Sequence, residues 1–235
     1  MLKNRTLIVA LAVVVCLFLA KVLPGHADTA TPGALAVAPS SSSSNNLLAD
    51  PAASKIDVAA AMQDRVLGDD KAPVTIDEYA SLTCPHCAHF DKEILPEVKK
   101  RLIDTGKAKL VFHDFPLDGV ALRAAMMTRC VSPLQYYNMV DVIFTKQEFW
   151  IKAQDPLAEL QKLGSLAGLD AADFKSCTEN KDLETAILKE MQTAQDKYKV
   201  ASTPTFIFNH GADQFAGAQP IEKFEETVNK LSKGK

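Results

Sequence analysis

The chain has 235 residues, with 26 Lys and Arg against 29 Asp and Glu, so its formal net charge is −3. Hydrophobic residues make up 47% of the sequence, and there are five cysteines. This composition is ordinary for a globular protein and excludes wholesale disorder, a collagen-like chain and a polytopic membrane protein. The slight acidic excess predicts no nucleic-acid partner, because proteins that bind nucleic acids usually carry a basic patch or stripe.

The first 27 residues have the pattern of a signal peptide. Lys3 and Arg5 precede an uncharged apolar run over residues 7–20. This run is shorter than the roughly 18–20 residues that a comfortable membrane span needs. We expect residues 1–27 to be removed by cleavage after Ala27, and an uncleaved membrane anchor is the alternative. Either way, we expect export to the periplasm, an oxidising compartment in which disulfides persist.

Two segments separate this signal from the first predicted strand. Residues 28–54 are rich in Ala, Pro, Ser and Thr, and such a composition buries too little apolar surface to offset the entropy of ordering. We expect a flexible linker there. Residues 55–68 carry apolar side chains at roughly helical spacing, which predicts an N-terminal helical extension. The extension could pack on the domain or bind a partner, and the sequence leaves both possibilities open.

A cysteine pair follows the first predicted strand. Residues 74–80 alternate well enough for a strand, and the motif Cys84-Pro85-His86-Cys87 comes shortly after them. A helix is expected to follow over residues 85–103, and Pro85 suits its first position because the missing N–H is not needed there. Cys84 is therefore placed at a helix N-terminus, and Cys87 lies one turn further in.

This placement predicts redox chemistry. The unpaired backbone N–H groups and the positive end of the helix dipole favour a thiolate at a helix N-terminus. Cys84 is the expected exposed nucleophile, and Cys87 is the more buried resolving thiol. His86, between them, can add a positive charge or a hydrogen-bond donor to the thiolate. Because stabilising the reduced form makes the disulfide a stronger oxidant, the pair is expected to give its disulfide away readily.

Other uses of the cysteine motif fit less well. Haem attachment requires CxxCH, and the residue after the second cysteine is Ala88. A structural zinc site needs further ligands, and the sequence has no second CxxC. We therefore predict no metal ligands and no cofactor beyond the redox-active disulfide itself. His113 and His210 have no motif around them and are expected to be surface or packing residues.

Glu78 is a candidate proton carrier. It lies six residues before Cys84, on the same predicted strand face as Val74 and Ile76. A carboxylate beneath the resolving thiol can take or relay a proton as Cys87 attacks or leaves. The alternative is a solvated or salt-bridged Glu at the end of a strand.

The rest of the chain contains strand and helix signals in an informative order. A second strand is expected at residues 109–116, and strand character returns only at residues 205–208 and 213–216. Helices are expected at residues 120–130, 134–145, 157–166, 171–177, 183–198 and 220–231. The order predicts an α/β protein, a thioredoxin fold with an inserted all-helical domain, in which the first two strands are parallel. The two parts of the thioredoxin fold are expected at residues 69–116 and 200–235, with the insertion at residues 117–199.

Cys130 and Cys177 both fall in the predicted insertion. Export and the even number of cysteines after the signal peptide favour a structural disulfide between them. Such a bond would stabilise the fold by about 4 kcal/mol through loop closure. Two separate buried thiols are the alternative.

Two motifs together resemble a known family. The motif Cys84-Pro85-His86-Cys87 after Glu78-Tyr79-Ala80-Ser81 resembles the DsbA family of bacterial thiol:disulfide oxidoreductases, thioredoxin-fold proteins with an inserted helical domain. The run from Ser202 to Phe208 is similar to the cis-proline loop and following strand of that family. The resemblance covers about residues 65–233. It implies a cis bond before Pro204, an acidic residue at position 78, and a Thr203 backbone that binds extended substrate beside Cys84.

The resemblance also implies a function. It predicts an exported oxidoreductase that donates its Cys84–Cys87 disulfide to unfolded or partly folded exported proteins with cysteines. A DsbB-like membrane reoxidase coupled to quinone is the expected second partner.

Two alternatives stay open. A disulfide isomerase or reductase of the same family is one, because Thr203 departs from the Val of the best-known strong oxidants and residues 55–67 could form an oligomerisation arm. A periplasmic copper-binding thiol module is the other.

Overall fold

The structure, a computed structural model, describes residues 56–233. The expected signal peptide at residues 1–27 and the expected linker at residues 28–54 lie outside these residues. The strands are β1 (Val66–Leu67), β2 (Val74–Ala80), β3 (Ala108–Asp114), β4 (Thr205–Phe208) and β5 (Asp213–Ala216). The helices are α1 (Val58–Ala61), α2 (Pro85–His89), α3 (Leu95–Val98), α4 (Gly119–Cys130), α5 (Tyr136–Thr145), α6 (Gln147–Ile151), α7 (Pro156–Leu166), α8 (Ala171–Thr178), α9 (Lys181–Tyr198) and α10 (Ile221–Ser232).

The strands form one mixed sheet in the order β1-β3-β2-β4-β5. β2 and β3 run parallel, as a right-handed crossover predicts, with Val74 opposite Ala108 and Ala80 opposite Asp114. β1 pairs antiparallel with β3, and β4 pairs antiparallel with both β2 and β5. Every residue of β2 is buried, so the loop that follows this central strand leaves from a fixed position.

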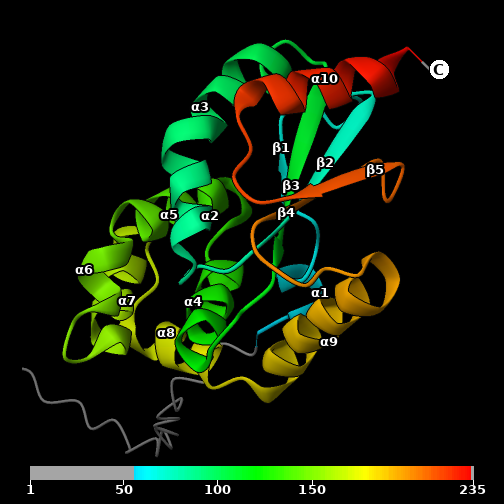
Figure 1. The fold of residues 1–235 in the computed structure, drawn as a ribbon. Coiled ribbons are helices and arrows are strands. Elements are labelled where there is room, and N and C mark those ends of the chain that lie inside the picture. The colour runs from blue at the N-terminus through cyan, green and yellow to red at the C-terminus, as the bar shows by residue number, and fades with distance from the viewer. Residues whose placement is uncertain (1–55, 234–235) are drawn as a thin grey trace, which may run out of the picture. The chain divides into compact units, whose positions relative to one another are not determined.

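Different helices cover the two faces of β2 (Figure 1). Val74 and Ile76 belong to an apolar cluster with Phe90, in the helical run that follows β2, and Phe224 of α10. Tyr79 belongs to another cluster, which includes Ala194 of α9. Because successive strand residues point to opposite faces, neighbouring residues of β2 face different helices.

One helical run carries the chain from Pro85 to Ile103. It begins as α2 and widens over Phe90–Ile94 into a π-helical segment, in which the Leu95 N–H donates to the Phe90 carbonyl five residues back. It continues as α3, with Pro96 in the first turn, and ends in a second π-helical segment, Lys99–Ile103. Pro96 has no backbone N–H to donate, and the widened turn before it adjusts the helix to this missing hydrogen bond.

Helices α4 to α9 form the helical insertion between β3 and β4. Tyr136, Phe144 and Trp150 are fully buried in its core, and Trp150 Nε1 donates to the Ile143 carbonyl at 2.9 Å. Phe149, by contrast, is exposed. Within residues 56–233, no helix combines the length and the apolar character needed to cross a membrane.

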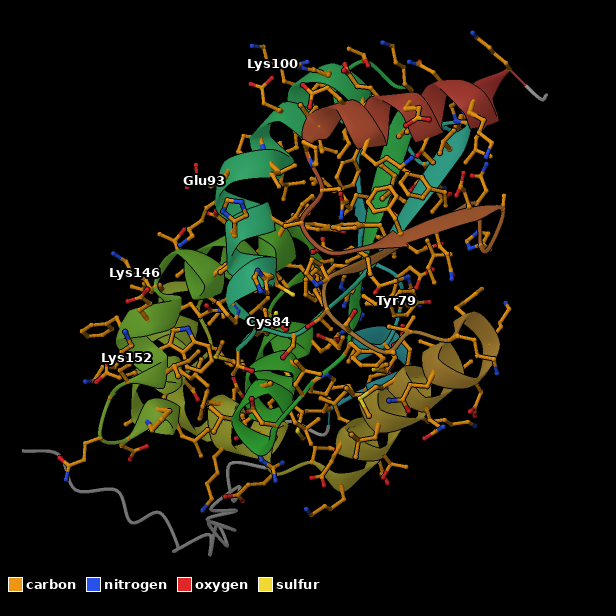
Figure 2. All side chains as sticks on the ribbon, in the orientation of Figure 1. Tyr79, Cys84, Glu93, Lys100, Lys146 and Lys152 are labelled. Carbon is orange, nitrogen blue, oxygen red and sulfur yellow. A yellow bond between two sulfur atoms is a disulfide. The ribbon has the colours of Figure 1, made fainter. Side chains whose placement is uncertain are left out.

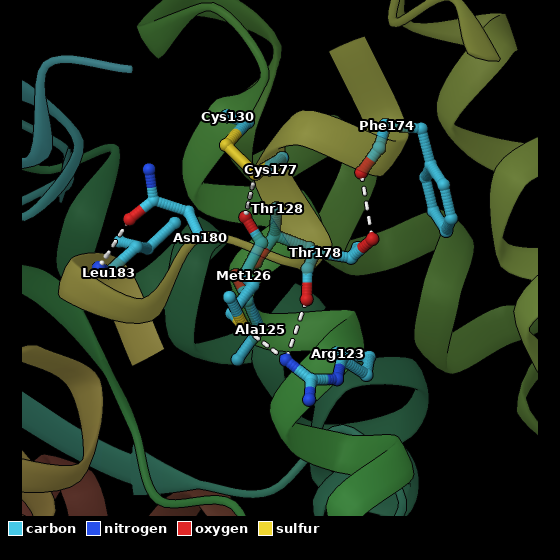
Figure 3. Close-up of a disulfide and its surroundings, with 10 residues drawn as sticks. All are labelled: Arg123, Ala125, Met126, Thr128, Cys130, Phe174, Cys177, Thr178, Asn180 and Leu183. Atoms are coloured by element: carbon cyan, nitrogen blue, oxygen red, sulfur yellow. Dashed lines mark hydrogen bonds between the residues drawn. A yellow bond between two sulfur atoms is a disulfide. The ribbon is translucent and has the colours of Figure 1, made fainter. Parts of the chain in front are cut away.

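A disulfide between Cys130 and Cys177 links the end of α4 to α8 (Figure 3). The two Cα atoms are 6.3 Å apart. Beside this bond, Arg123 of α4 donates from Nη1 to the Thr178 carbonyl at 2.6 Å (Figure 3). The disulfide and this hydrogen bond therefore join the same two helices, α4 and α8, and stabilise the insertion.

The N-terminal extension expected at residues 55–68 is only partly helical. α1 spans Val58–Ala61, and Asp57 caps it by accepting from the Ala60 N–H at 3.1 Å. The chain then extends, and Val66–Leu67 form β1 at the edge of the sheet. Gly68 has a φ of +110°, and a Cβ there would lie 2.6 Å from Ile103 Cγ2. This positive φ ends the strand in a conformation that a helix cannot adopt.

Two further details differ from the sequence-based expectations. α6 was not predicted, because five residues are too few for a periodic pattern. The strand expected at residues 109–116 ends at Asp114, although the Phe115 N–H still donates to the Ala80 carbonyl at 2.8 Å. Pro116 has no N–H with which to continue the ladder.

Candidate active site

Cys84 lies where the central strand gives way to a helix (Figure 2). Its N–H donates to the Ser81 carbonyl at 3.0 Å, which turns the chain after β2. Cys84 is the N-cap of α2, with Pro85 in the first turn, and its carbonyl accepts the first helical hydrogen bond from Ala88 at 3.1 Å. The backbone N–H groups of the first turn are therefore available to the Cys84 sulfur.

The two cysteines of the motif are free thiols in this structure. Cys84 is 7% exposed and Cys87 is 0% exposed. Cys84 is thus the more accessible sulfur, as the sequence predicts, but it is much less exposed than its position at a helix end indicates. Only a thiol that enters the space beside α2 can reach it.

Gln147 and Asp118 fix the loop that carries Cys84. Gln147 is buried at the start of α6, and its Nε2 donates to the Leu82 carbonyl at 2.9 Å and to the Cys84 carbonyl at 3.0 Å. Asp118 caps α4 and accepts from Thr83 Oγ1 at 2.6 Å. Sequence analysis missed both residues, because neither belongs to a local motif and each acts across more than thirty residues.

The loop before β4 reaches Cys84 from the far end of the sequence. The Thr203–Pro204 bond is cis. Cys84 Sγ lies 3.4 Å from the Thr203 carbonyl oxygen, to which the protonated thiol can donate. The Gly217 N–H donates to the Pro204 carbonyl at 2.8 Å and fastens the loop to the end of β5. The structure therefore brings the two sequence motifs together.

The environment separates the acidities of the two thiols. The hydrogen bond from the Cys87 thiol, aided by Thr203 and the N–H groups of Cys87 and His86, outweighs burial and lowers the pKa of Cys84 to about 5. Burial, the bond to Cys84 and the charges of Cys84 and Glu78 raise the pKa of Cys87 far above its usual range. At neutral pH the pair is one thiolate and one thiol.

Glu78 is buried on the Cys87 side of β2. Its side chain is 2% exposed, and no donor among residues 56–233 reaches its Oε1. Burial and the nearby charge of Asp91 raise the pKa of Glu78 well above its usual range. The alternative of a solvated or salt-bridged Glu is therefore wrong: Glu78 is a buried carboxyl without a bonded partner among the described residues, and when it is ionised its charge raises the pKa of Cys87.

Of the two possibilities expected for His86, a charge or a donor, the second is found: its side chain is exposed, and its contribution to the Cys84 thiolate comes from the backbone N–H. His113 is a packing residue, as expected, because its ring stacks on Tyr79. It also bonds to Asp77 and Glu190 on the α9 face of the sheet, which the sequence did not indicate. His210 is a surface residue, as expected, although it also contacts Asp77 at 3.1 Å.

A groove of about 450 Å³ lies beside Cys84. Its lining is mostly apolar and comes from the cysteine loop, the start of α4 and the α6–α7 region: Thr83, Cys84, Pro85, Leu117, Asp118, Val120, Ile151 and Pro156. Leu117 is exposed at its rim. The groove gives an extended apolar peptide a path to the sulfur.

Comparisons with known proteins all match thioredoxin-like proteins or proteins that form disulfides. A family model described as Thioredoxin matches residues 60–230. The crystal structure of alpha-DsbA1 from Wolbachia pipientis aligns with a TM-score of 0.66 and 31% identity, covering 72% of this chain and 91% of that chain. Disulfide bond formation protein D of Bacillus subtilis is 30% identical over 181 residues, which are 72% of this chain and 78% of that protein.

Longer relatives also match. A Rickettsia prowazekii protein named as a protein-disulfide oxidoreductase is 32% identical over 150 residues, covering 62% of this chain and 54% of that protein. This chain therefore spans about half the length of the Rickettsia relatives that it matches.

Proposed function

The chain belongs to the DsbA-like thiol:disulfide oxidoreductases of the thioredoxin superfamily, and on that premise we propose that it donates a Cys84–Cys87 disulfide to cysteines of newly exported proteins. One arrangement carries the proposal: the Cys84 sulfur lies at the N-terminus of α2, 3.4 Å from the Thr203 carbonyl oxygen, and against the fully buried Cys87. This environment lowers the pKa of Cys84 to about 5 and raises that of Cys87. A pair so divided has a defined nucleophile and a defined resolving group.

The reaction proceeds in two exchanges. A substrate thiolate attacks Cys84 Sγ, a substrate–Cys84 bond forms, and the Cys84–Cys87 bond breaks with its electron pair on Cys87. Cys87 then takes up a proton. A second substrate thiolate attacks the substrate sulfur of the mixed disulfide, and Cys84 leaves as a thiolate. The substrate loses two electrons and the protein gains them, so the redox-active disulfide is the only cofactor required.

The acidity of Cys84 supports the proposed direction, in which the protein oxidises its substrate. A drop in the Cys84 pKa from 9.0 to about 5 stabilises the dithiol form by roughly 3–5 kcal/mol. This corresponds to a reduction potential on the order of 100 mV more oxidising than that of an unperturbed pair. Cys84 is also a good leaving group, which speeds the release of oxidised substrate.

Glu78 serves as the proton donor and acceptor for Cys87. Burial and the charge of Asp91 raise the pKa of Glu78, which favours the protonated carboxyl that can give its proton to Cys87 as that sulfur leaves. In reoxidation the proton returns to Glu78 when Cys87 attacks. Pro85 lies in the first turn of α2, and the His86 backbone N–H helps to lower the pKa of Cys84. Both residues favour the Cys84 thiolate.

The substrate binds along the cis-proline loop and the groove. The Thr203 backbone beside Pro204 is positioned to pair with an extended peptide whose cysteine reaches Cys84. Apolar residues near that cysteine would occupy the 450 Å³ groove. Unfolded or partly folded proteins expose such segments, which favours them as substrates over folded proteins.

Export and reoxidation complete the proposal. The pattern of residues 1–27 and the export of DsbA-like proteins support a periplasmic location, with a membrane-anchored form as the variant. A DsbB-like membrane reoxidase coupled to quinone would restore the Cys84–Cys87 disulfide. No nucleic-acid partner is expected.

The isomerase alternative receives less support. It relied partly on residues 55–67 as an oligomerisation arm. Ile56, Val58 and Met62 instead pack against the helical core of the same chain, and Val66–Leu67 pair with β3. The identity of Thr203 still leaves the reduction potential as the deciding measurement.

Variants of the pair test the proposal. The disulfide form of the unaltered protein is mixed with a reduced peptide that contains two cysteines. The single-cysteine variants have no disulfide to give, so they are mixed with the same peptide in its disulfide form. The products are trapped by acid and analysed by mass. Cys84→Ser is expected to abolish exchange, whereas in Cys87→Ser the Cys84 thiolate attacks the peptide disulfide and a mixed disulfide is expected to accumulate. The double variant Cys130→Ser/Cys177→Ser is the matched control, and in its folded fraction we expect peptide oxidation to continue.

The opposing outcomes are equally specific. Full turnover of Cys87→Ser without trapped adducts would contradict the assigned roles. A reduction potential as low as that of a thioredoxin would favour a reductase, and a stable oligomer that is lost on removal of residues 28–67 would favour an isomerase. Tight stoichiometric copper(I) binding with little peptide oxidation would favour the copper module.

A further inference from the structure

Proton transfer at Cys87 raises a problem of access, given the proposed function. Cys87 is 0% exposed and Glu78 is 2% exposed. The Cys84 side of the pair is covered by substrate whenever a mixed disulfide exists. Glu78 can exchange one proton with Cys87, but repeated turnover requires that Glu78 also exchange protons with solvent. That exchange needs a route on the side away from Cys84.

Asp91 lies on this inner side. It is four residues after Cys87 in the same helical run, so the two side chains share one helix face. Asp91 is only 7% exposed, and no donor among the described residues reaches its Oδ1. It is close enough to Glu78 for its charge to raise the pKa of Glu78. Asp91 is therefore a second unpaired buried carboxyl, next to the first.

Asp141 connects Asp91 to solvent. It lies on α5, is exposed, and shares a hydrogen bond with Asp91 when either carboxyl is protonated. Both side chains line a cavity of about 430 Å³, which is separate from the groove beside Cys84. Tyr137 forms part of its wall and is held by a hydrogen bond from its hydroxyl to the Arg65 carbonyl at 2.6 Å.

We propose that Asp91 and Asp141 form the outer part of a proton path that joins Cys87 and Glu78 to solvent through this cavity. When Cys87 leaves as a thiolate, Glu78 gives it a proton, and Asp91 restores that proton from Asp141 and the cavity water. When Cys87 attacks a mixed disulfide, the proton moves in the opposite direction. Asp91 and Asp141 act through Glu78 and are positioning residues for proton transfer.

The surroundings of Asp91 suit this role. Burial, the charge of Asp141 and the bond to Asp141 raise the pKa of Asp91 to about 7, and Lys92 partly opposes them. A group that is half protonated near neutral pH can both accept and release protons. Lys99 and Asp104 line the same cavity, and Glu78 faces Asp91 from β2.

The step in which Cys87 attacks isolates the proton path. The full-length dithiol protein is mixed with oxidised glutathione. Cys84 first forms a glutathione adduct, and Cys87 then releases it. Acid quenching and mass analysis give both rates. Asp141→Asn is expected to leave adduct formation unchanged and to slow release of the adduct about tenfold. The loss is partial because Glu78, the residue nearest the Cys87 sulfur, is intact and only the outer end of the path is interrupted.

Two further readouts separate proton transfer from structural support. Imidazole can enter a cavity of 430 Å³ and carry protons, so it is expected to restore release in Asp141→Asn in proportion to its concentration. Asp141→Glu is expected to retain most of the rate. Asp104→Asn is the matched control, because Asp104 lines the same cavity and carries the same charge but is not among the groups that shift the pKa of Asp91.

Several outcomes would overturn the proton path. These are an unchanged release rate in Asp141→Asn, an equal loss in Asp104→Asn, or a loss that neither imidazole nor Glu restores. Failure of the unaltered protein to form the first adduct would instead overturn the proposed function, because that step depends on Cys84 and not on the path.

Discussion

Asp77 and Glu78 are neighbours in β2, yet their carboxyl groups lie in opposite kinds of environment. Asp77 faces α9 and contacts His113 Nε2 and His210 Nδ1, each at 3.1 Å. Glu78 faces the active-site helix, and no donor within residues 56–233 reaches its Oε1. Both carboxyl groups are almost fully buried. One strand therefore carries a paired acid on one face and an unpaired acid on the other.

The difference in pairing explains why Glu78, and not Asp77, is suited to proton transfer. A buried ion has to be compensated, because removal from water costs several kcal/mol. On the α9 face, His113 supplies the compensation to Asp77 and also bonds through Nδ1 to Glu190 at 2.6 Å. On the other face, burial raises the pKa of Glu78 and so favours its uncharged form, which avoids the penalty. A protonated carboxyl can give its proton away, whereas an ion-paired carboxylate has no proton to give and must break its contacts to take one.

Loss of His113 is expected to have the largest effect on stability. His113→Ala leaves Asp77 and Glu190 without their buried cation and should lower the free energy of unfolding by about 3–5 kcal/mol. Urea unfolding measures this change. Exchange at Cys84 should persist in the folded fraction, because the cluster lies on the other face of the sheet. A loss below about 1 kcal/mol would show that the cluster is no tighter than a surface ion pair.

The same cluster predicts a pH dependence of stability. The bonds to Asp77 and Glu190 outweigh burial and raise the pKa of His113 to about 9. The stabilisation is complete below the unfolded-state pKa of about 6.5 and is lost as the pH rises through about 9, for a change of about 3 kcal/mol.

This measurement should use the disulfide form of the protein. In the dithiol form, the lowered pKa of Cys84 adds stability as the pH rises from about 5, which opposes the His113 trend. Glu190 does not interfere, because its pKa is lowered and its contribution is lost only in acid. His113→Ala is the control, and its stability curve should be flatter over the same range. Parallel curves for both proteins would assign the trend to another group.

Glu78→Gln should separate stability from activity. The amide has the size of the carboxyl but never ionises, so it removes the burial penalty that grows as the pH rises through the raised pKa of Glu78. We expect the free energy of unfolding of the variant to exceed that of the unaltered protein by an amount that grows with pH and reaches about 1 kcal/mol in alkaline solution. Release of the glutathione adduct by Cys87 should slow about 100-fold, or roughly 2.7 kcal/mol. If Glu78→Gln were less stable and fully active, Glu78 would be a structural residue like Asp77 and not a proton carrier.

Local signals explain what the sequence could predict. The strand, the cysteine motif and the helix are contiguous, so their relation follows from backbone geometry and the fixed position of Pro85. The fold class followed from the order of these signals. The contact between Thr203 and Cys84 was expected only from the family resemblance, because no local pattern joins residues so far apart.

The remaining site residues depend on tertiary contacts. Gln147 lies in a helix too short to show periodicity. Asp91 and Asp141 look like ordinary charged positions in helices, and only the packing of α5 against the active-site helix brings them together. Sequence analysis therefore identifies the two cysteines and the neighbouring Glu78, whereas the connection from Glu78 to Asp91 and Asp141 emerges only from the structure.

His210→Ala tests whether burial or the number of contacts makes the Asp77 cluster strong. His210 lies at the same distance from Asp77 as His113 does, but its side chain is 69% exposed. Water screens an exposed pair and the imidazole loses rotational freedom to form it, so we expect a loss below about 1 kcal/mol in urea unfolding. The pH dependence near 9 should remain, because His113 still titrates between Asp77 and Glu190. A loss as large as that of His113→Ala would mean that Asp77 needs both histidines, and that pairing on this face is cooperative across the turn after β4.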